Sequence, residues 1–156
     1  MKIKLNPNDV KCVVNARAHV MKCFTPEGLK WTIPAHCEGV NGPGWDTPSG
    51  DTPPGMYEIG LITKTQPSEP QSIWNAYGRW FCDLVELENQ EASRGRAGVG
   101  VHAGGSSLEN PLAPYQGWAP TLGCLRLQNQ DLETVFVPMC QFVKKNKGKI
   151  YVEVVW

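Results

Sequence analysis

The chain has 156 residues, of which 41% are hydrophobic, and its 15 basic residues balance its 15 acidic ones. A chain of this length and composition buries roughly two-thirds of its unfolded surface, so we expect residues 1–156 to form a single folded domain and not a disordered chain. The balanced charge, with no run of more than two Lys or Arg residues, argues against a nucleic-acid partner.

Membrane insertion is not expected, because no apolar run approaches the ~20 residues that span a bilayer. The N-terminal segment begins Met-Lys-Ile-Lys but lacks the apolar core of a signal peptide. The sequence leaves open whether the chain stays inside the cell or is exported by another route.

Short runs that are rich in β-branched residues or alternate in hydrophobicity dominate the chain, and they predict strands. The expected strands are residues 10–15, 19–25, 29–36, 56–64, 80–87, 99–102 and 149–156. Turn-rich segments separate them at residues 39–55, 65–79 and 88–98. Short strands with Gly- and Pro-rich turns are typical of a mostly antiparallel β-sandwich or barrel. Pro34 marks its strand as an edge strand, because proline cannot donate a ladder hydrogen bond.

One amphipathic helix is expected near the C-terminus. Asn129 is its candidate N-cap, and lysines crowd its far end before Gly148. Pro138 must kink this helix or split it into two pieces. The apolar residues with helical spacing are Leu132, Val135, Phe136, Met139, Cys140 and Val143. The predicted fold class is therefore mainly β, a single-domain sandwich or barrel-like fold with one main helix.

The six cysteines and the histidines at positions 19 and 36 do not predict a metal site. The six cysteines show no C-x-x-C spacing and no clustering with histidine, which argues against zinc. Cys12 and Cys23 flank an expected hairpin and would pair only in an oxidising compartment. His19 and His36 fall in expected strands, where a structural or solvent-facing role is the ordinary one.

Residues 99–127 contain two apolar runs, each delivering a reactive residue: His102 and Cys124. A thiol is only partly ionised near neutral pH, so a nucleophilic cysteine needs a base such as this histidine beside it. Gly123 lacks a side chain, so we expect successive backbone N–H groups of the Gly123–Cys124 step to point at one spot and stabilise an oxyanion. Arg126 shares strand parity with the cysteine and is a candidate ligand for a substrate carboxylate.

At these residues the sequence resembles a known family. Residues 121–127 resemble the [Ser/Thr]-x-Gly-Cys-x-Arg signature of L,D-transpeptidase (YkuD-type) catalytic domains. Residues 101–105 resemble the His-Gly segment of that family, and residues 50–57 are similar to its Thr-Pro-x-Gly-x-Tyr/Phe strand start. Residues 129–132 match the helix start that usually follows the signature. The four segments occur in the family's order.

The resemblance implies a β-fold enzyme that acts on peptidoglycan stem peptides without a metal or an organic cofactor. Cys124 would attack the carbonyl of the L-centre of the diamino acid at stem position three and expel the terminal D-alanine. The thioester would pass to an amine of a second stem and form a 3→3 cross-link. His102 would act as the base, oriented by the backbone carbonyl of Ala103. Acylation by carbapenems is also expected. The candidate substrate-binding residues are Arg126, Gly104, Thr121, Trp118 and Tyr115.

The sequence departs from the family pattern at two places, and other functions remain open beside the transpeptidase. Leu122 replaces a histidine that the family often has before Gly-Cys, and the loop at residues 106–120 is longer than expected. Tyr115 and Trp118 on this loop are either walls of a substrate site or anchors of the loop. A hydrolase with the same nucleophile, a carboxypeptidase or endopeptidase, and a non-catalytic wall-binding module are the competing functions. The resemblance implies a cell-envelope location if the chain is exported, and a cytoplasmic location stays open. No protein partner is predicted.

Overall fold

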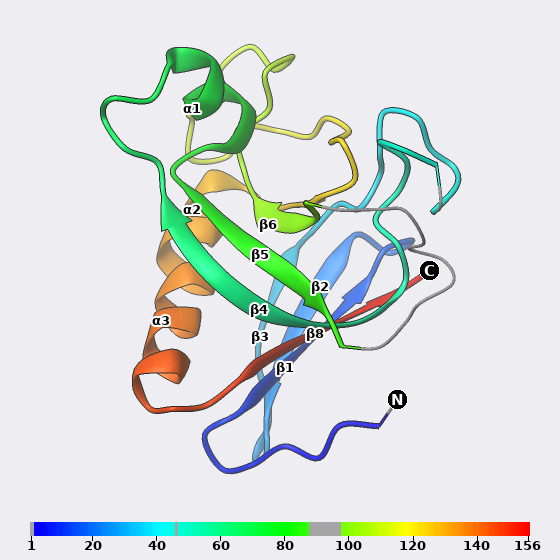
Figure 1. Cartoon of the computed structure of the whole chain (residues 1–156), viewed down its shortest axis with the longest axis vertical. Coiled ribbons are helices and arrows are strands. Elements are labelled where there is room, and N and C mark those ends of the chain that lie inside the picture. Colours follow the sequence, from blue (N-terminus) through cyan, green and yellow to red (C-terminus); the bar gives the residue numbers. More distant parts are fainter. Residues whose placement is uncertain (1, 46, 88–97) are drawn as a thin grey trace.

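A curled, mixed sheet of eight strands forms the body of the molecule, and a C-terminal helix lies against it (Figure 1). The computed structural model describes residues 2–45, 47–87 and 98–156. The predicted loop at residues 88–98 falls outside the described residues except for Gly98. The strand order is β3-β2-β1-β8-β4-β5-β6-β7. The strands are β1 (Val10–Asn15), β2 (Val20–Thr25), β3 (Gly28–Pro34), β4 (Gly55–Lys64), β5 (Trp80–Glu86), β6 (Gly100–His102), β7 (Leu125–Arg126) and β8 (Ile150–Val155).

The predicted mainly β fold is confirmed, and seven of the strands lie where alternation placed them. Most neighbours are antiparallel, but β1 pairs with β8 and β6 with β7 in parallel. In β1 and β8 every second residue is buried, because successive side chains point to opposite faces of a strand. Cys12 and Val152 are opposite each other in this register and lie in the core with the apolar face of the helix.

The C-terminal helix is continuous but changes its winding. It comprises α2 (Asn129–Asp131), a π-helical segment η2 (Leu132–Phe136) and α3 (Val137–Lys145). At the end of η2 the N–H of Val137 bonds to the carbonyl of Leu132, five residues back. This wider turn rotates the apolar face and buries Val137, which the predicted stripe omits. Pro138 lies in the first turn of α3, where its missing N–H is tolerated.

Two details of the predicted helix and loops are wrong. Gln128, not Asn129, precedes the helix as its N-cap, and it makes no side-chain capping bond. The segment at 65–79 contains a helix, α1 (Gln71–Tyr77), that begins after Pro70 without a capping side chain and has no buried residue. A helix of this kind shows neither a start signal nor an apolar stripe in the sequence.

The two edges of the sheet meet and close it into a barrel-like shape. Just beyond β3, the backbone of His36 exchanges two hydrogen bonds with Arg126 on β7, at 3.0 and 2.8 Å. A second bridge, between Gly39 and Thr121, continues this junction. We call residues 36–39 together with 121–126 the closing seam. The free edge of β7 is thereby covered, which protects it from pairing with other chains.

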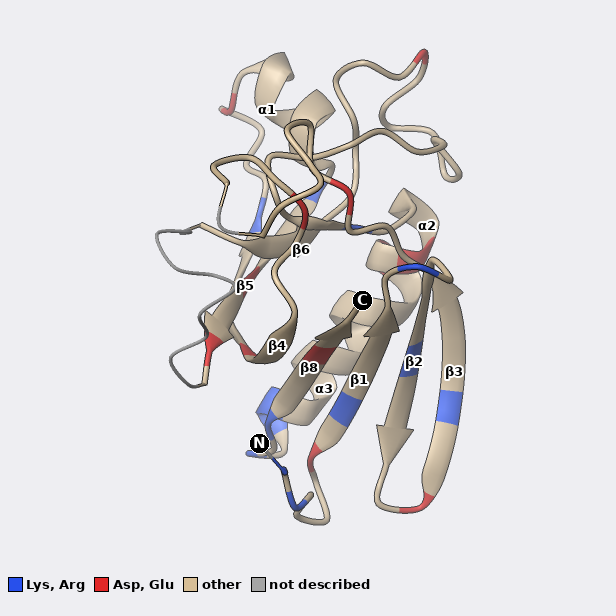
Figure 2. Cartoon of the chain, turned by 90° about the vertical axis from the view of Figure 1, so that its right-hand side faces the viewer, with Lys and Arg blue, Asp and Glu red and all other residues tan. Residues whose placement is uncertain are grey.

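Charge is distributed in local pairs. Figure 2 shows basic residues along β1, β2 and β3, with acidic residues interspersed elsewhere. Lys11 on β1 and Glu153 on β8, for example, are 2.9 Å apart. Among the described residues no helix is long and apolar enough to cross a bilayer. No disulfide joins the six cysteines, all of which are described, although Cys12 and Cys23 face each other across β1 and β2.

Candidate active site

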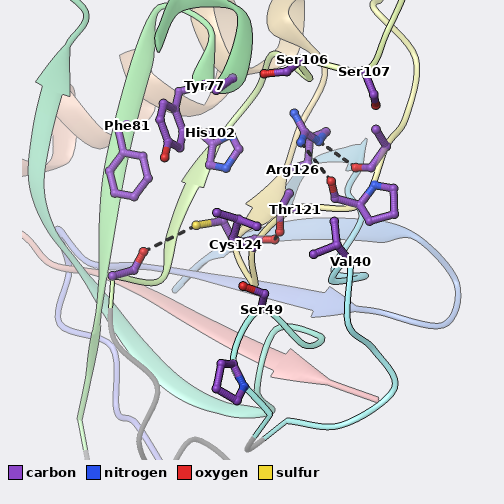
Figure 3. A pocket seen from close by; sticks show the side chains of 16 residues that line it. Val40, Ser49, Tyr77, Phe81, His102, Ser106, Ser107, Thr121, Cys124 and Arg126 are labelled. Carbon is purple, nitrogen blue, oxygen red and sulfur yellow. Dashed lines mark hydrogen bonds between the residues drawn. The ribbon is translucent and has the colours of Figure 1, made fainter. Parts of the chain in front are cut away.

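The end of β6 and the turn before β7 bring His102 and Cys124 to one cavity. The two strands are parallel neighbours, with Val101 beside Leu125. Cys124 is therefore level with Gly100, two positions before His102, and the histidine and the cysteine project from the same face of the pair. Both side chains line a cavity of about 760 Å³ at the closing seam (Figure 3). This volume is in the range of pockets that hold small ligands. The strands that carry His102 and follow Cys124, β6 and β7, are thus paired with each other.

His102 is buried and fixed in one orientation. Its Nδ1 donates a hydrogen bond of 2.7 Å to the carbonyl of Ala103. Because a carbonyl only accepts, the proton of the neutral ring is on Nδ1, and Nε2 is the basic nitrogen. Tyr77 packs edge-on against the imidazole at 4.9 Å, and Phe81 stacks over it at 5.8 Å. The ring therefore has little freedom to turn.

Burial and charge keep His102 neutral. Burial, and to a lesser degree the positive charge of Arg126, lower its pKa to about 3, against a small opposing contribution from the Ala103 carbonyl. The imidazole is thus a free base across the physiological pH range. Such a group accepts a proton readily only while a developing charge beside it makes the imidazolium favourable.

The turn that carries Cys124 is held by hydroxyl groups. Thr121 Oγ1 donates to the carbonyl of Cys124 at 2.8 Å and accepts from the N–H of Gly123 at 2.9 Å. Thr52 Oγ1 donates to the Gly123 carbonyl at 2.9 Å. The φ of Gly123 is 115°, a value that side-chain-bearing residues rarely adopt. Gly123 therefore shapes the turn. Its N–H is engaged by Thr121, and the oxyanion role of the Gly123–Cys124 backbone stays a prediction.

The thiol of Cys124 lies at the floor of the cavity. Its sulfur donates to the carbonyl of Gly98 at 3.6 Å, and the residue is only 7% exposed. Leu122, two positions earlier, is 67% exposed at the rim. The residue that replaces the family's second histidine thus adds an apolar surface beside the nucleophile.

Arg126 is buried with its guanidinium directed at backbone carbonyls. Nη1 donates to Ala103 at 2.7 Å, Nε to Ala119 at 2.9 Å, and Nη2 to Pro120 at 3.4 Å. Burial lowers its pKa to about 10, an effect that Cys124 partly opposes. Arg126 lines the cavity, and these bonds use three of its five N–H groups, so carboxylate binding stays a prediction. The side chain also supports the carbonyl that orients His102.

Three predicted substrate residues are placed elsewhere. Gly104, Tyr115 and Trp118 are not among the described residues that line the cavity, whereas Thr121 is. A side chain at Gly104 would collide with the backbone of Asn75 and Gly78, so this glycine permits close packing on α1. Tyr115 is 68% exposed, and Trp118 stacks on His36 outside the cavity. Trp118 thus anchors the loop on His36, whereas Tyr115 is exposed.

The sequence analysis missed several residues that shape the site. Tyr77 and Phe81, which enclose the imidazole, lie on a helix and a strand that carry no sequence motif. Asn129, expected as a helix cap, uses its side chain to bind the N–H of Gly104 and the carbonyls of Pro111 and Ala113. Thr52 and Asn129 had a signal, because they belong to the Thr-Pro-x-Gly segment and to the helix start at residues 129–132.

The chain was compared with known proteins. No protein-family model and no curated protein matches it, but solved structures do. Pgp2, the helical cell shape determining protein of Campylobacter jejuni, shares 20% identity with a TM-score of 0.60 over 94% of this chain and 47% of its own. An L,D-transpeptidase (Yku) from Stackebrandtia nassauensis shares 12% identity at a TM-score of 0.54, over 99% of this chain and 59% of its own. An L,D-transpeptidase from Mycobacterium tuberculosis H37Rv shares 16% identity at 0.52, over 94% and 57%.

The chain has the L,D-transpeptidase fold. At these low identities the likeness concerns the fold alone. The chain spans about half the length of the solved structures that it matches. The sequence resemblance at residues 50–57, 101–105, 121–127 and 129–132 implied this fold, and the fold is therefore confirmed.

Proposed function

We propose that this chain is a cysteine acyltransferase of the L,D-transpeptidase type that acts on peptidoglycan stem peptides. One observation supports the proposal above all. A histidine with its Nδ1 proton fixed by a carbonyl, and its Nε2 basic, shares a cavity with a cysteine in this fold. That pair is what thiol acyl transfer requires: a nucleophile and a base whose tautomer is set by a third group.

In the first step, the Cys124 sulfur attacks the carbonyl of the L-centre at stem position three. Its proton passes to Nε2 of His102, and the sulfur–carbon bond forms as the carbonyl oxygen becomes an oxyanion. Collapse of this intermediate breaks the peptide bond to D-alanine, and the imidazolium returns the proton to the leaving amine. The resulting thioester is then attacked by an amine of a second stem, which forms the 3→3 link and restores the thiol.

The low pKa of His102, about 3, constrains how the first step proceeds. So weak a base does not hold a proton at rest, so the imidazole waits in its neutral form. Proton transfer therefore accompanies sulfur attack, when negative charge on the oxyanion stabilises the imidazolium. Arg126 supports this step by holding the Ala103 carbonyl that fixes the ring.

The experiment supplies purified tetrapeptide muropeptides and follows products by mass spectrometry. The proposal expects 3→3 dimers with release of D-alanine, and a covalent carbapenem adduct on Cys124. The matched control is Cys140→Ala, which removes a buried thiol on the helix outside the cavity. Cys140→Ala should keep both the products and the adduct, and Cys124→Ala should lose both.

The same measurement separates the alternatives. Free tripeptide in place of dimers would contradict the transferase and indicate a hydrolase that uses the same nucleophile. Neither product, together with no adduct on Cys124, would contradict both enzymes and leave a wall-binding module. Because the proposed substrate is peptidoglycan, we expect the chain to act at the cell envelope.

A further inference from the structure

A second cluster of reactive side chains lies on the closing seam, outside the catalytic cavity. His19 precedes β2, and His36 and Glu38 follow β3. One potential ligand atom from each of the three lies within 4.8 Å of the others. None of the three lines the cavity described above. The cluster plays no part in the proposed acyl transfer, so its arrangement needs a separate explanation.

Hydrogen bonding does not account for the cluster. Nδ1 of His19 is 3.3 Å from Oε1 of Glu38, but the contact lacks hydrogen-bond alignment, and this buried nitrogen has no hydrogen-bond partner. Nδ1 of His36 is 3.5 Å from Oε2 of the same carboxylate. A buried polar atom without a partner carries a free-energy cost and calls for an explanation such as an ion.

The spacing fits a metal ion. Two ligands bound at about 2.0–2.1 Å in a tetrahedral site are roughly 3.3 Å from each other, close to both measured nitrogen–oxygen separations. The imidazoles of His19 and His36 stack at 4.1 Å and 20°, so one ring must rotate to share an ion. Rotation about the Cβ–Cγ bond of histidine is soft, and this movement costs little.

Access also favours a ligand role. The φ of 55° at His19 belongs to the turn between β1 and β2, in which its N–H bonds to the Ala16 carbonyl. The side chains of His19 and Glu38 are 42% and 37% exposed, so an ion can enter from solution.

We propose that His19, His36 and Glu38 form a binding site for a zinc ion, with water as the fourth ligand. Two imidazoles and one carboxylate suit zinc among the biological divalent ions. This proposal departs from the sequence-based expectation of no zinc site, which considered motif spacing and not residues brought together from two segments. It does not depend on the proposed acyl transfer.

The position of the site gives the ion a structural consequence. The His36 backbone pairs with Arg126, and the Glu38 carbonyl accepts the N–H of Thr121 at 3.0 Å. The ring of Trp118 stacks on His36 at 3.8 Å and 11°, which ties the loop before Thr121 to the same point. A bound ion would therefore stiffen the segment on which the Cys124 turn is built.

The test titrates the metal-free, reduced protein with zinc by calorimetry and repeats the titration with cobalt(II) in the visible range. We expect one equivalent to bind, and His36→Phe, Glu38→Gln and His19→Asn each to weaken binding at least about tenfold. His36→Phe retains a ring against Trp118, and asparagine tolerates the left-handed backbone of residue 19. Thermal melting of each metal-free variant checks that it is folded.

Two controls guard against binding by thiols. Cys124→Ser and the exposed, distant Glu27→Gln should bind zinc as the unaltered chain does. Cobalt should give tetrahedral d–d absorption without a sulfur-to-cobalt charge-transfer band. No binding at millimolar zinc, a sulfur charge-transfer band, or undiminished affinity in the three ligand variants would each overturn the proposal.

Discussion

The helix-covered half of the sheet and the closing seam are built on different principles. Around β1 and β8, ladder hydrogen bonds run for six residues on each strand, and every second side chain enters the core. At the seam the backbone pairing shrinks to single bridges, and hydroxyl, amide and guanidinium groups bind the remaining carbonyls. The first region gains its stability from apolar burial, and the second is specified by polar contacts. Stability and chemistry should therefore respond to mutation separately.

Cys124→Ala should produce the largest difference between the effect on turnover and the effect on stability. Removing the nucleophile should lower turnover by roughly 10⁴-fold or more. The free energy of unfolding should change by less than about 1 kcal/mol, because the thiol makes one weak contact with Gly98. Activity assays and urea denaturation of the same preparation check both. Residual turnover near the unaltered rate would remove Cys124 from the mechanism.

His102→Asn should change how stability depends on pH. The folded-state pKa of His102 lies near 3, below its unfolded value near 6.5. Between these values only the unfolded chain takes up the proton, so the free energy of unfolding falls as the pH drops through this window. The loss is about 1.4 kcal/mol per pH unit. The His102→Asn variant lacks this pH-dependent loss of stability. Its side-chain amide can replace Nδ1 of His102 as the hydrogen-bond donor to the Ala103 carbonyl.

The measurement for His102→Asn is denaturation at several pH values between about 6.5 and 4. Other titrating groups act in both proteins, so the difference between the two slopes isolates this histidine. Parallel slopes would mean that the imidazole is not held neutral by its surroundings.

Phe136→Ala should damage the helix-covered half. The side chain is fully buried between the helix and the sheet, and its truncation should cost about 3–5 kcal/mol. Phe142→Ala is the matched control, since that phenylalanine lies on the same helix but is 68% exposed. We expect the control to change stability by no more than about 0.5 kcal/mol. Equal losses of stability in Phe136→Ala and Phe142→Ala would contradict the placement of Phe136 in the core.

Thr121→Val should act on the seam with a smaller loss of stability. It leaves the Gly123 N–H and the Cys124 carbonyl without their shared hydroxyl, at a cost of about 1–3 kcal/mol. Turnover should fall more steeply than stability, because the nucleophile is carried by this turn. Thr134→Val, which removes an exposed hydroxyl bonded to the Gln130 carbonyl, is the control. A variant that loses stability but keeps its rate would contradict the role of the turn.

The sequence predicted the regular half well for a physical reason. Alternation and helical spacing record which side chains must be buried, so β1, β8 and the apolar face of α3 could be placed from residues alone. The wider turn of η2 could not, because Pro138 indicates a disruption without specifying that an extra residue is accommodated.

The site was predicted unevenly. Cys124 and His102 were found because motif spacing and family resemblance point to them. The contacts of Arg126, Trp118 and Gly123 were not, because each depends on which carbonyl or ring lies nearby after the sheet closes. The proximity of His19 to Glu38 follows from the pairing of β2 with β3, which sets residue 19 beside the chain that leaves β3, and no sequence motif marks it.

The place of β8 has a consequence for the order of folding. This strand comes last among the eight yet lies in the middle of the sheet, between β1 and β4. The β1–β3 meander and the strands β4 to β7 are therefore separate pieces until residues 150–155 insert between them. Non-local pairing of this kind is slow to form. We expect a folding chain to acquire its local hairpins early, and to bring His102 and Cys124 into a competent site only at the end.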